Sequence, residues 1–343
     1  MTTTTKIVFL FPGQGAQYPG MALDLLETGS VKVRELFELA SEIMGRDMAA
    51  LLRDSDAESL KHMAQPAITL ANLAAAALLG ERGIYPLACA GHSLGEYAAL
   101  CVAGLISAAD CLSLVKHRAA AMQRALDGLA AGMAQAAGMA QAASMAQAAG
   151  MAAEIGLAPA LVEELTARWR AEAAKGGEDR ALAELYAANF NSPRQTVVSG
   201  SAAALALAGE RFLAAGARRV LPLQVAGPFH SPLMAKAEEE FRPALENIPF
   251  GDPDIPVYSN VTGERIGCGA EAKRLALKQI TSPVRWTAEE QALRETGMEI
   301  ALEAGPGRVL QGLWKDSPCP LPCFPAGTAA EIEDLLEKLK EGV

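Results

Sequence analysis

Short apolar runs that are typical of buried strands alternate along this chain with longer helical patterns. The clearest run, 7–11, reads Ile-Val-Phe-Leu-Phe and ends at a Pro-Gly loop. Segment 31–44 repeats apolar residues at spacings of three and four, and segment 68–79 is almost wholly apolar, so both predict helices. Further strands are predicted at 87–90, 195–199, 219–223, 256–260 and 299–303, and further helices at 94–103 and 202–215. Strands that alternate with helices predict an α/β fold with a parallel sheet.

Composition restricts the classes of protein to which the chain can belong. Its 343 residues correspond to about two domains of ordinary size, and 51% hydrophobic residues can form full cores. The formal net charge of -10 argues against nucleic-acid binding, which depends on clustered Lys and Arg. No stretch predicts a signal peptide or a membrane-spanning helix. The six scattered cysteines fit reduced thiols, so we expect a cytoplasmic protein.

A six-residue repeat interrupts the alternation between residues 128 and 150. Gly-Met-Ala-Gln-Ala-Ala begins at Gly132, recurs at Gly138 and returns with a first-position serine at Ser144. Six residues advance about 240° around a helix, so equivalent positions fall on three faces and form no apolar stripe. We expect an exposed loop or a lightly packed helix here, the alternative being an arm that binds a partner.

The pentapeptide Gly-His-Ser-Leu-Gly at 91–95 lies between a predicted strand and a predicted helix. Flanking glycines allow a sharp turn at Ser93, so that its hydroxyl projects from the end of the strand. The helix that begins near Leu94 directs free N–H groups at a developing oxyanion. This context favours a nucleophile over an ordinary turn between strand and helix, which the pattern alone also fits.

A serine nucleophile needs a base, and histidine is the usual one. His62 and His117 lie in polar or charged helical stretches, and His92 is on the other side of the turn from Ser93. His230 stands in a loop between Gly-Pro-Phe and Ser-Pro, just after a predicted strand. We therefore expect His230 to be the base, the alternative being a structural histidine.

Seven motifs follow one another in a fixed order along the chain. They are FPGQGAQ (11–17), GHSLGEY (91–97), KHRA (116–119), NFN (189–191), FHSPLM (229–234), Gln279 with SPVRW (282–286), and EAGPG (303–307). In this order they resemble the malonyl-CoA:acyl carrier protein transacylases. That family includes stand-alone enzymes of fatty-acid synthesis and acyltransferases that serve polyketide synthases in trans. The resemblance covers nearly the whole chain except the repeat.

The resemblance implies a covalent mechanism. Ser93 would attack the thioester of malonyl-CoA, and His230 would take its proton. The backbone N–H groups of Gln14 and Leu94 would hold the oxyanion. A main-chain carbonyl near Gln279 orients the histidine in this family, so no triad carboxylate is expected. No metal or resident cofactor is implied, because the phosphopantetheine arm belongs to the carrier protein.

The resemblance also implies substrate-binding residues. The planar guanidinium of Arg118 would grip the free malonyl carboxylate, whereas its spacing alone fits a solvated helix arginine. Phe229 matches malonyl-selective members, in which an aromatic ring crowds an α-methyl group, although it could simply pack in the core. The other candidates, of which the amides could also cap turns, are His92, Asn189, Asn191 and Gln279.

The fold implied by the resemblance is a large α/β-hydrolase-like domain with an inserted small ferredoxin-like domain. The large domain would comprise 1–127 and 224–343, the small domain 151–223, and the repeat at 128–150 would be an extra insert. Expected partners are malonyl-CoA and an acyl carrier protein, and the enzyme is expected to be a monomer. Acidic carriers need local positive charge. Two groups are candidates, although both fit solvated helix faces: Lys273, Arg274 and Lys278, or Arg218 and Arg219.

Three other functions stay open at this point. An acyl hydrolase that clears carrier proteins would use the same serine and histidine, but Arg118 speaks against it. A lipase or esterase would turn over simple esters without a carrier protein. A non-catalytic docking subunit would keep the fold and gain no malonyl adduct.

Overall fold

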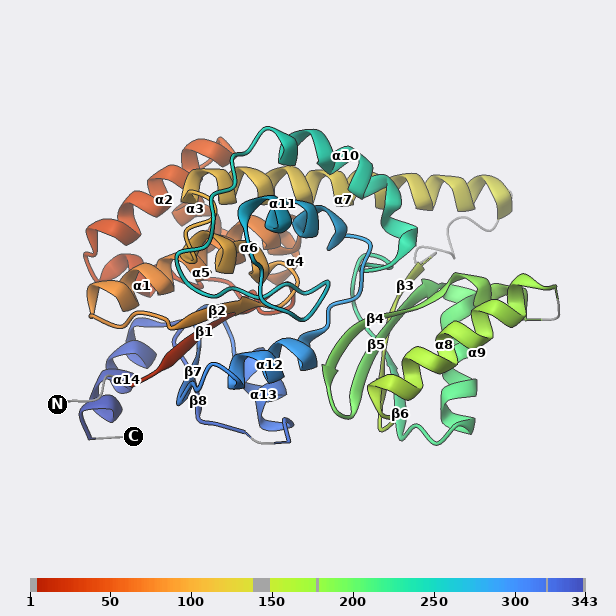
Figure 1. Cartoon of the computed structure of the whole chain (residues 1–343). Coiled ribbons are helices and arrows are strands. Elements are labelled where there is room, and N and C mark those ends of the chain that lie inside the picture. The colour runs from red at the N-terminus through yellow and green to blue at the C-terminus, as the bar shows by residue number, and fades with distance from the viewer. Residues whose placement is uncertain (1–4, 138–148, 177–178, 319, 342–343) are drawn as a thin grey trace. The chain divides into compact units, whose positions relative to one another are not determined.

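A computed structural model of the chain describes residues 5–137, 149–176, 179–318 and 320–341 (Figure 1). The chain forms two compact units, each with its own sheet. The first unit comprises Met1–Ala119, Ala244–Ala276 and Ala288–Val343. The second comprises Ala120–Pro243 and Leu277–Thr287.

The first unit is built on a four-stranded parallel sheet in the order β2-β1-β7-β8. Its strands are β1 (Ile7–Phe11), β2 (Ala88–Gly91), β7 (Ile300–Glu303) and β8 (Cys323–Pro325). Every residue of β1, β2 and β7 is buried, as expected for parallel strands that helices cover on both faces. The predicted parallel sheet is confirmed.

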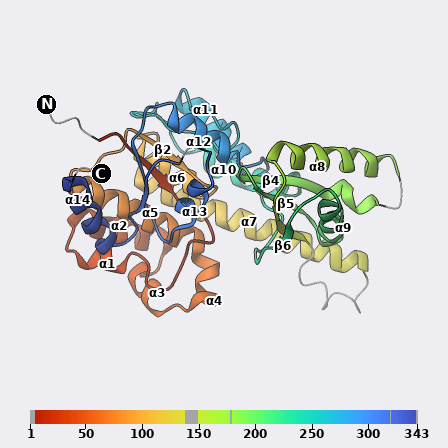
Figure 2. The ribbon, with the colours of Figure 1, turned by 90° about the horizontal axis from the view of Figure 1, so that it is seen from below.

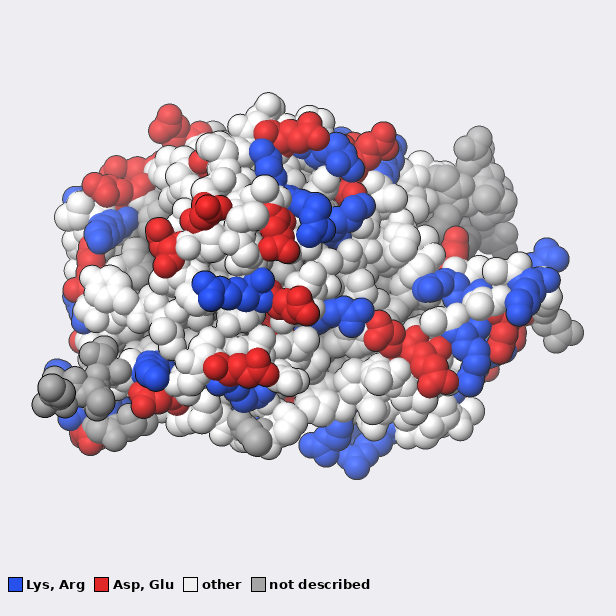
Figure 3. Space-filling view, viewed as in Figure 1, with Lys and Arg blue, Asp and Glu red and all other residues white. Residues whose placement is uncertain are grey.

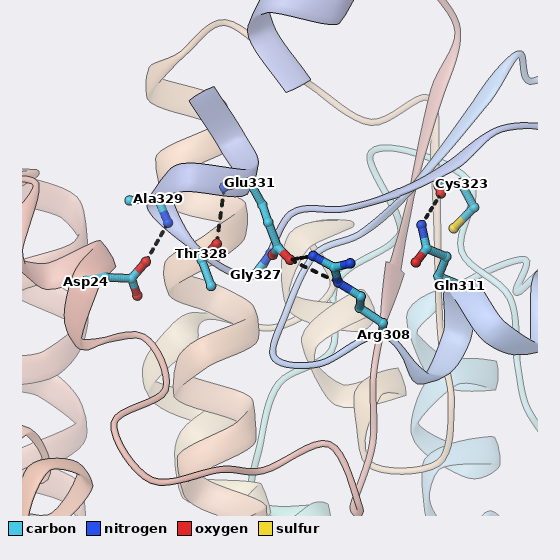
Figure 4. A network of polar contacts seen from close by, with 8 residues as sticks. All are labelled: Asp24, Arg308, Gln311, Cys323, Gly327, Thr328, Ala329 and Glu331. Atoms are coloured by element: carbon cyan, nitrogen blue, oxygen red, sulfur yellow. Dashed lines mark hydrogen bonds and ion pairs between the residues drawn. The ribbon is translucent and has the colours of Figure 1, made fainter. Parts of the chain in front are cut away.

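Several helices begin at a residue whose side chain caps them. Thr328 Oγ1 accepts the N–H of Glu331 at the start of the last helix, and Glu331 in turn accepts the N–H of Gly327, in the manner of a capping box (Figure 4). Arg308 pairs with Glu331 at 2.9 Å.

The helices are α1 (Leu23–Glu27), α2 (Val31–Met44), α3 (Met48–Asp54), α4 (Ala57–Leu60), α5 (Ala64–Glu81), α6 (Gly95–Val102), α7 (Ala108–Ala137), α8 (Pro159–Ala174), α9 (Ala202–Ala214), α10 (Ala235–Glu246), α11 (Gly269–Lys278), α12 (Trp286–Arg294), α13 (Val309–Lys315) and α14 (Ala329–Glu341).

The second unit carries an antiparallel sheet in the order β4-β5-β3-β6. Its strands are β3 (Ala149–Ile155), β4 (Leu185–Ser192), β5 (Gln195–Ser201) and β6 (Arg219–Pro222). Helices α8 and α9 share one apolar core with this sheet (Figure 2). The rings of Trp169 on α8 and Phe212 on α9 meet there with centroids 4.9 Å apart. The α/β class is therefore mixed, with one parallel and one antiparallel sheet.

The predicted elements agree with the structure in most places. Segment 256–260, predicted as a strand, forms only two isolated bridges, a parallel one between Cys89 and Val257 and an antiparallel one between Tyr258 and Arg265. The reason is that the chain turns back at Ser259, whose N–H donates to the carbonyl of Glu264. For the repeat we expected either a loop or a helix. Helix α7 continues to Ala137, so the start of the repeat is helical. Residues 138–148 lie outside the described residues.

Among the described residues, one helical stretch, Ala57–Glu81, could cross a membrane by its length and composition. Its most apolar 18-residue window is 72% buried, however. The stretch includes α5, against which α2 and α6 pack, and this packing accounts for its apolar character.

Candidate active site

Ser93 occupies a strained turn between β2 and α6. Its φ is +52°, and only two other non-glycine residues of the described chain have a positive φ. Such a conformation costs about 1–3 kcal/mol and is common at functional sites. Glycines provide the space for this turn, because a Cβ on Gly91 would overlap the backbone of Gly95, and a Cβ on Gly95 would overlap the carbonyl of Phe11. The sharp turn predicted at Ser93 is therefore present.

One backbone N–H group of the turn has no acceptor among the residues that the structure describes. The N–H of Ser93 donates to Asn260 Oδ1 at 2.7 Å, and that of Gly95 donates to the carbonyl of His92 at 3.0 Å. Within the described residues, the N–H of Leu94 has no acceptor. It stands at the N-terminus of α6, where the helix dipole favours negative charge. The Leu94 N–H is thus available to an oxyanion.

Gln14 lies in the loop that follows β1, next to this turn. A Cβ on the preceding Gly13 would overlap the carbonyl oxygen of His92 and would lie 3.5 Å from the nitrogen of Leu94. The N–H of Gln14 also has no acceptor in the part of the chain that the structure describes. The two N–H groups predicted to hold an oxyanion therefore lie on adjacent loops of the first unit, and neither has an acceptor among the described residues.

Arg118 is buried in the first unit, with 2% of its surface exposed, so it is not a solvated helix arginine. Its Nη1 donates to Gln65 Oε1 at 2.7 Å, and its guanidinium carbon lies 5.5 Å from the ring centroid of Tyr97. Burial lowers the pKa of Arg118, while its interactions with Tyr97 raise it. A guanidinium nevertheless keeps its proton in proteins. Arg118 therefore carries a positive charge into the interior, and its planar fork suits a carboxylate ligand.

His230 lies in the second unit, just before a short 3₁₀ turn at Pro232–Met234, and it is 4% exposed. Its Nδ1 lies 3.0 Å from the carbonyl oxygen of Gln279. Because a carbonyl oxygen can only accept, Nδ1 carries the proton and Nε2 is the basic nitrogen. This is the main-chain contact that the resemblance implies. The φ of His230 is +56°, so it is strained in the same way as Ser93.

Hydrogen bonds on both sides hold His230 in this conformation. Ser199 Oγ donates to the carbonyl of Phe229 at 2.5 Å, and Ser231 Oγ donates to the carbonyl of Pro228 at 2.6 Å. Phe229 itself is 9% exposed. The backbone before and after the histidine is therefore fixed within its own unit.

Strand β4 fixes the segment that follows Gln279. Val284 exchanges two backbone hydrogen bonds of 2.8 Å with the outer edge of β4. Asn189 and Asn191 lie on this strand and are 5% and 8% exposed. The pairing explains why the carbonyl of Gln279 is held at a defined place next to the imidazole.

The predicted site residues divide equally between the units. The first unit holds Gln14, His92, Ser93, Leu94 and Arg118, and the second holds Asn189, Asn191, Phe229, His230 and Gln279. Sequence reasoning missed three polar residues that contact these groups: Gln65, Ser199 and Asn260. Asn260 could have been suspected, because it ends an apolar run in a chain whose sites gather at strand ends.

Comparisons with known proteins match almost the entire chain to acyl transferases. A family model described as "Acyl transferase domain" matches residues 8–174 and 135–317. The malonyl CoA-acyl carrier protein transacylase of Bacillus subtilis (strain 168) is 35% identical over 342 residues, which is 98% of each chain. The chain belongs to the malonyl-CoA:acyl carrier protein transacylase family.

Solved structures of similar proteins share the fold of this transacylase family member. An acyl carrier protein S-malonyltransferase from Vibrio cholerae is 35% identical with a TM-score of 0.83, over 96% of this chain and 100% of that one. A malonyl-transacylase solved in complex with its type II polyketide synthase acyl-carrier protein is 34% identical with a TM-score of 0.83, over 97% and 100% of the two chains.

Proposed function

We propose that this acyltransferase moves a malonyl group from malonyl-CoA to the phosphopantetheine thiol of an acyl carrier protein, through an ester on Ser93. The observation that carries the proposal is the buried guanidinium of Arg118 in the same unit as the strained Ser93 turn. A serine on such a turn suits an acyl-enzyme mechanism. A buried guanidinium selects an acyl group with a free carboxylate. The carrier protein serves fatty-acid or polyketide synthesis.

In the first half-reaction, the Ser93 hydroxyl attacks the thioester carbonyl of malonyl-CoA. His230 Nε2 takes the hydroxyl proton as the new C–O bond forms. The N–H groups of Gln14 and Leu94 stabilise the negative charge on the carbonyl oxygen. The tetrahedral intermediate then expels the CoA thiolate, which takes the proton from His230, and the malonyl group remains as an ester on Ser93.

In the second half-reaction, the phosphopantetheine thiol of the carrier protein replaces CoA. His230 removes the thiol proton, and the thiolate attacks the ester carbonyl of malonyl-Ser93. The same two N–H groups hold the oxyanion. The C–O bond to Ser93 breaks, the serine oxygen regains the proton from His230, and the carrier leaves as its malonyl thioester.

Arg118 fixes the acyl group during both half-reactions. Two parallel hydrogen bonds from its guanidinium to the malonyl carboxylate select dicarboxylic acyl groups. By holding the acyl chain, Arg118 also keeps the ester away from attack by water, which disfavours the hydrolase alternative. Phe229 crowds an α-methyl group, which is worth only about 1–3 kcal/mol and gives a preference for malonyl. The remaining polar groups proposed to contact substrate are His92, Asn189, Asn191 and Gln279.

For the fold, we propose a hydrolase-like large domain, 1–127 with 224–343, and a ferredoxin-like small domain, 151–223. The element order β3-α8-β4-β5-α9-β6 supports the second description, because it is the β-α-β-β-α-β order of ferredoxin-like domains. The sheet order β4-β5-β3-β6 and the two helices on one core support it further. We propose the repeat at 128–150 as an insert between the domains.

For docking of the carrier, Arg218 and Arg219 are the better of the two basic groups. Lys273, Arg274 and Lys278 each bond to a carboxylate or carbonyl nearby. On the face drawn in Figure 3, Lys and Arg commonly lie beside Asp and Glu. Arg218 and Arg219 are exposed, and within the described residues no ion pair joins either to a carboxylate. They are free to contact an acidic partner.

The chemistry requires malonyl-CoA and a carrier protein only. The phosphopantetheine arm enters with the carrier, so the enzyme needs no resident cofactor of its own. We propose a cytoplasmic enzyme that acts as a monomer.

Intact-mass measurement tests the proposed function. After mixing with malonyl-CoA, the enzyme should gain one malonyl group, which a holo carrier protein should then remove and carry. Ser93→Ala should gain no malonyl group. A wild-type enzyme that gains no adduct, or an adduct that persists in Ser93→Ala, would contradict the mechanism.

A further inference from the structure

Asn260 bonds to three backbone or side-chain groups around the nucleophile turn, all within the first unit. Its Oδ1 accepts the N–H of Ser93 at 2.7 Å, and its Nδ2 donates to the carbonyl of Gly91 at 2.7 Å. Its backbone N–H donates to Glu96 Oε2 at 3.1 Å. One residue therefore contacts the turn before, at and after the serine.

The orientation of the Asn260 amide is determined by its partners. Nδ2 faces two acceptors, the carbonyl of Gly91 and Oε1 of Glu289 at 2.8 Å, so it must be the donor end. The oxygen end is then left for the N–H of Ser93. Asn260 has no exposed surface, so no water competes for these bonds.

This arrangement separates the N–H groups of the turn by role. The N–H of Ser93 is occupied by Asn260, whereas the N–H of the next residue, Leu94, is free among the described residues. A rotation of the turn that released Asn260 would move both groups. Because the φ of +52° at Ser93 is strained, the turn should change to a less strained conformation once these bonds are removed.

Glu289 accepts a hydrogen bond from the side-chain amide of Asn260. It has no exposed surface, and its Oε1 accepts the second proton of Asn260 Nδ2. Burial and the nearby carboxyl group of Glu96 raise its pKa well above the ordinary value. A neutral carboxylic acid at this place accepts the amide proton without adding a buried negative charge.

We propose that Asn260 is a positioning residue for Ser93, which holds the strained turn so that the hydroxyl is aimed for attack and the Leu94 N–H stays free for the oxyanion. The proposal rests on the proposed role of Ser93 as the nucleophile. Asn260 acts through the backbone of Ser93 and Gly91 and does not touch the substrate. Its loss should therefore change the rate of acylation more than the binding of malonyl-CoA.

The experiment compares Asn260→Ala with the full-length wild type in two assays. The first is the rate at which a fluorophosphonate labels Ser93, which needs the positioned serine and oxyanion donors but no malonyl contact. The second is single-turnover malonylation over a range of malonyl-CoA concentrations. We expect labelling and maximal acylation to slow by about 10–100-fold, while the half-saturating malonyl-CoA concentration changes by less than about 2-fold.

Two variants control for general loss of stability. Ser259→Ala removes a neighbouring hydroxyl that bonds to the N–H of Val261 at 3.2 Å, so it perturbs the same loop without touching the turn. It should label at the wild-type rate. Glu289→Gln keeps a neutral acceptor for Asn260 and should also label within about 2-fold of wild type. Melting temperatures are measured for all variants.

Wild-type labelling in folded Asn260→Ala would overturn the proposal. So would equal slowing in Ser259→Ala at the same melting temperature, because the effect would then be structural. If Asn260→Ala does not fold, Asn260→Leu removes both bonds to the turn while keeping a side chain of similar size, and wild-type labelling in that variant overturns the proposal. Failure of the proposed function is distinguishable, since the wild type would then form no malonyl ester on Ser93.

Discussion

At the scale of single residues, the two proposed catalytic groups share an unusual backbone. Ser93 and His230 have φ values of +52° and +56°, and each unit holds one of them. A strained residue persists only where its surroundings determine its conformation. Asn260 does this for the serine, and the hydroxyls of Ser199 and Ser231 do it for the histidine. Strain and its support are thus built separately into the two units.

Replacing Arg118 tests acyl selectivity. Arg118→Ala should lower kcat/KM for malonyl-CoA by about 100-fold or more, because two charge-assisted hydrogen bonds of about 1.5–3 kcal/mol each are lost. Transfer or hydrolysis of acetyl thioesters should be spared or increased. Arg118→Lys is the matched control, since it keeps the charge and loses the planar fork. Its kcat/KM for malonyl-CoA should lie between those of the wild type and Arg118→Ala. An unchanged ratio of malonyl to acetyl turnover in Arg118→Ala would show that the selectivity lies elsewhere.

Replacing Glu289 tests a pH dependence of stability. Burial first, and then the carboxyl groups of Glu96 and Glu290, raise the pKa of Glu289, while its bond from Asn260 lowers it. The folded protein therefore keeps a proton that the unfolded chain releases near pH 4.5. This contribution to stability is fully present below that pH and is lost as the pH rises toward the folded pKa.

We expect the free energy of unfolding of the wild type to fall more steeply as the pH rises above about 4.5 than that of Glu289→Gln, which cannot release a proton. Urea unfolding at intervals of one pH unit measures the difference. Glu337→Gln, at an exposed position of α14, is the control and should follow the wild type. Parallel curves for wild type and Glu289→Gln would rule out a titrating Glu289.

At the scale of elements, the close approach of backbones around the turn at Ser93 predicts that a Cβ added at a glycine there lowers the stability of the protein. Gly95→Ala places a Cβ against the carbonyl of Phe11, and helix α6 and strand β1, which pack against each other here, cannot move apart easily. It should destabilise the protein by about 3 kcal/mol or more. Gly312→Ala in α13 has open space at its Cβ and should stabilise the helix by about 0.5–1 kcal/mol. Denaturant unfolding compares the two, and similar effects would contradict the packing argument.

Periodicity predicted most elements because their stability is local or depends on one buried face. The run at 7–11 and the helix at 31–44 match β1 and α2 residue for residue. Segment 256–260 did not become a strand because the turn at Ser259 depends on a backbone bond to Glu264, which composition does not encode. Tertiary context decides such cases.

The site residues that lie in glycine-containing turns and loops were predicted from the sequence. The residues that hydrogen-bond to them from distant positions in the chain were missed. Asn260 lies 167 positions from Ser93, Gln65 lies 53 positions from Arg118, and Ser199 lies 30 positions from Phe229. A hydrogen bond across such a separation leaves no spacing that a pattern can detect. The burial of Arg118 likewise depends on packing around α7, so its helical spacing could not distinguish a buried from a solvated arginine.

At the scale of the whole molecule, charge governs the encounter with the carrier protein. The enzyme carries a formal charge of -10, which repels an acidic partner at long range. At about 0.1 M salt the screening length is about 10 Å, so this repulsion is largely removed while contacts at the interface persist. Among the proposed docking residues, Arg218 and Arg219 are exposed and able to form such contacts.

Above about 0.1 M salt we therefore expect KM for an acidic holo carrier to rise by several-fold as salt increases to about 0.5 M. Transfer to free pantetheine, an uncharged acceptor with the same thiol, controls for effects on acylation and should change by less than about 2-fold. The double variant Arg218→Gln with Arg219→Gln should raise KM at low salt and flatten its rise. A KM that falls with salt over this range would mean that the net charge of -10 dominates, and a slope unchanged in the double variant would place docking on other residues.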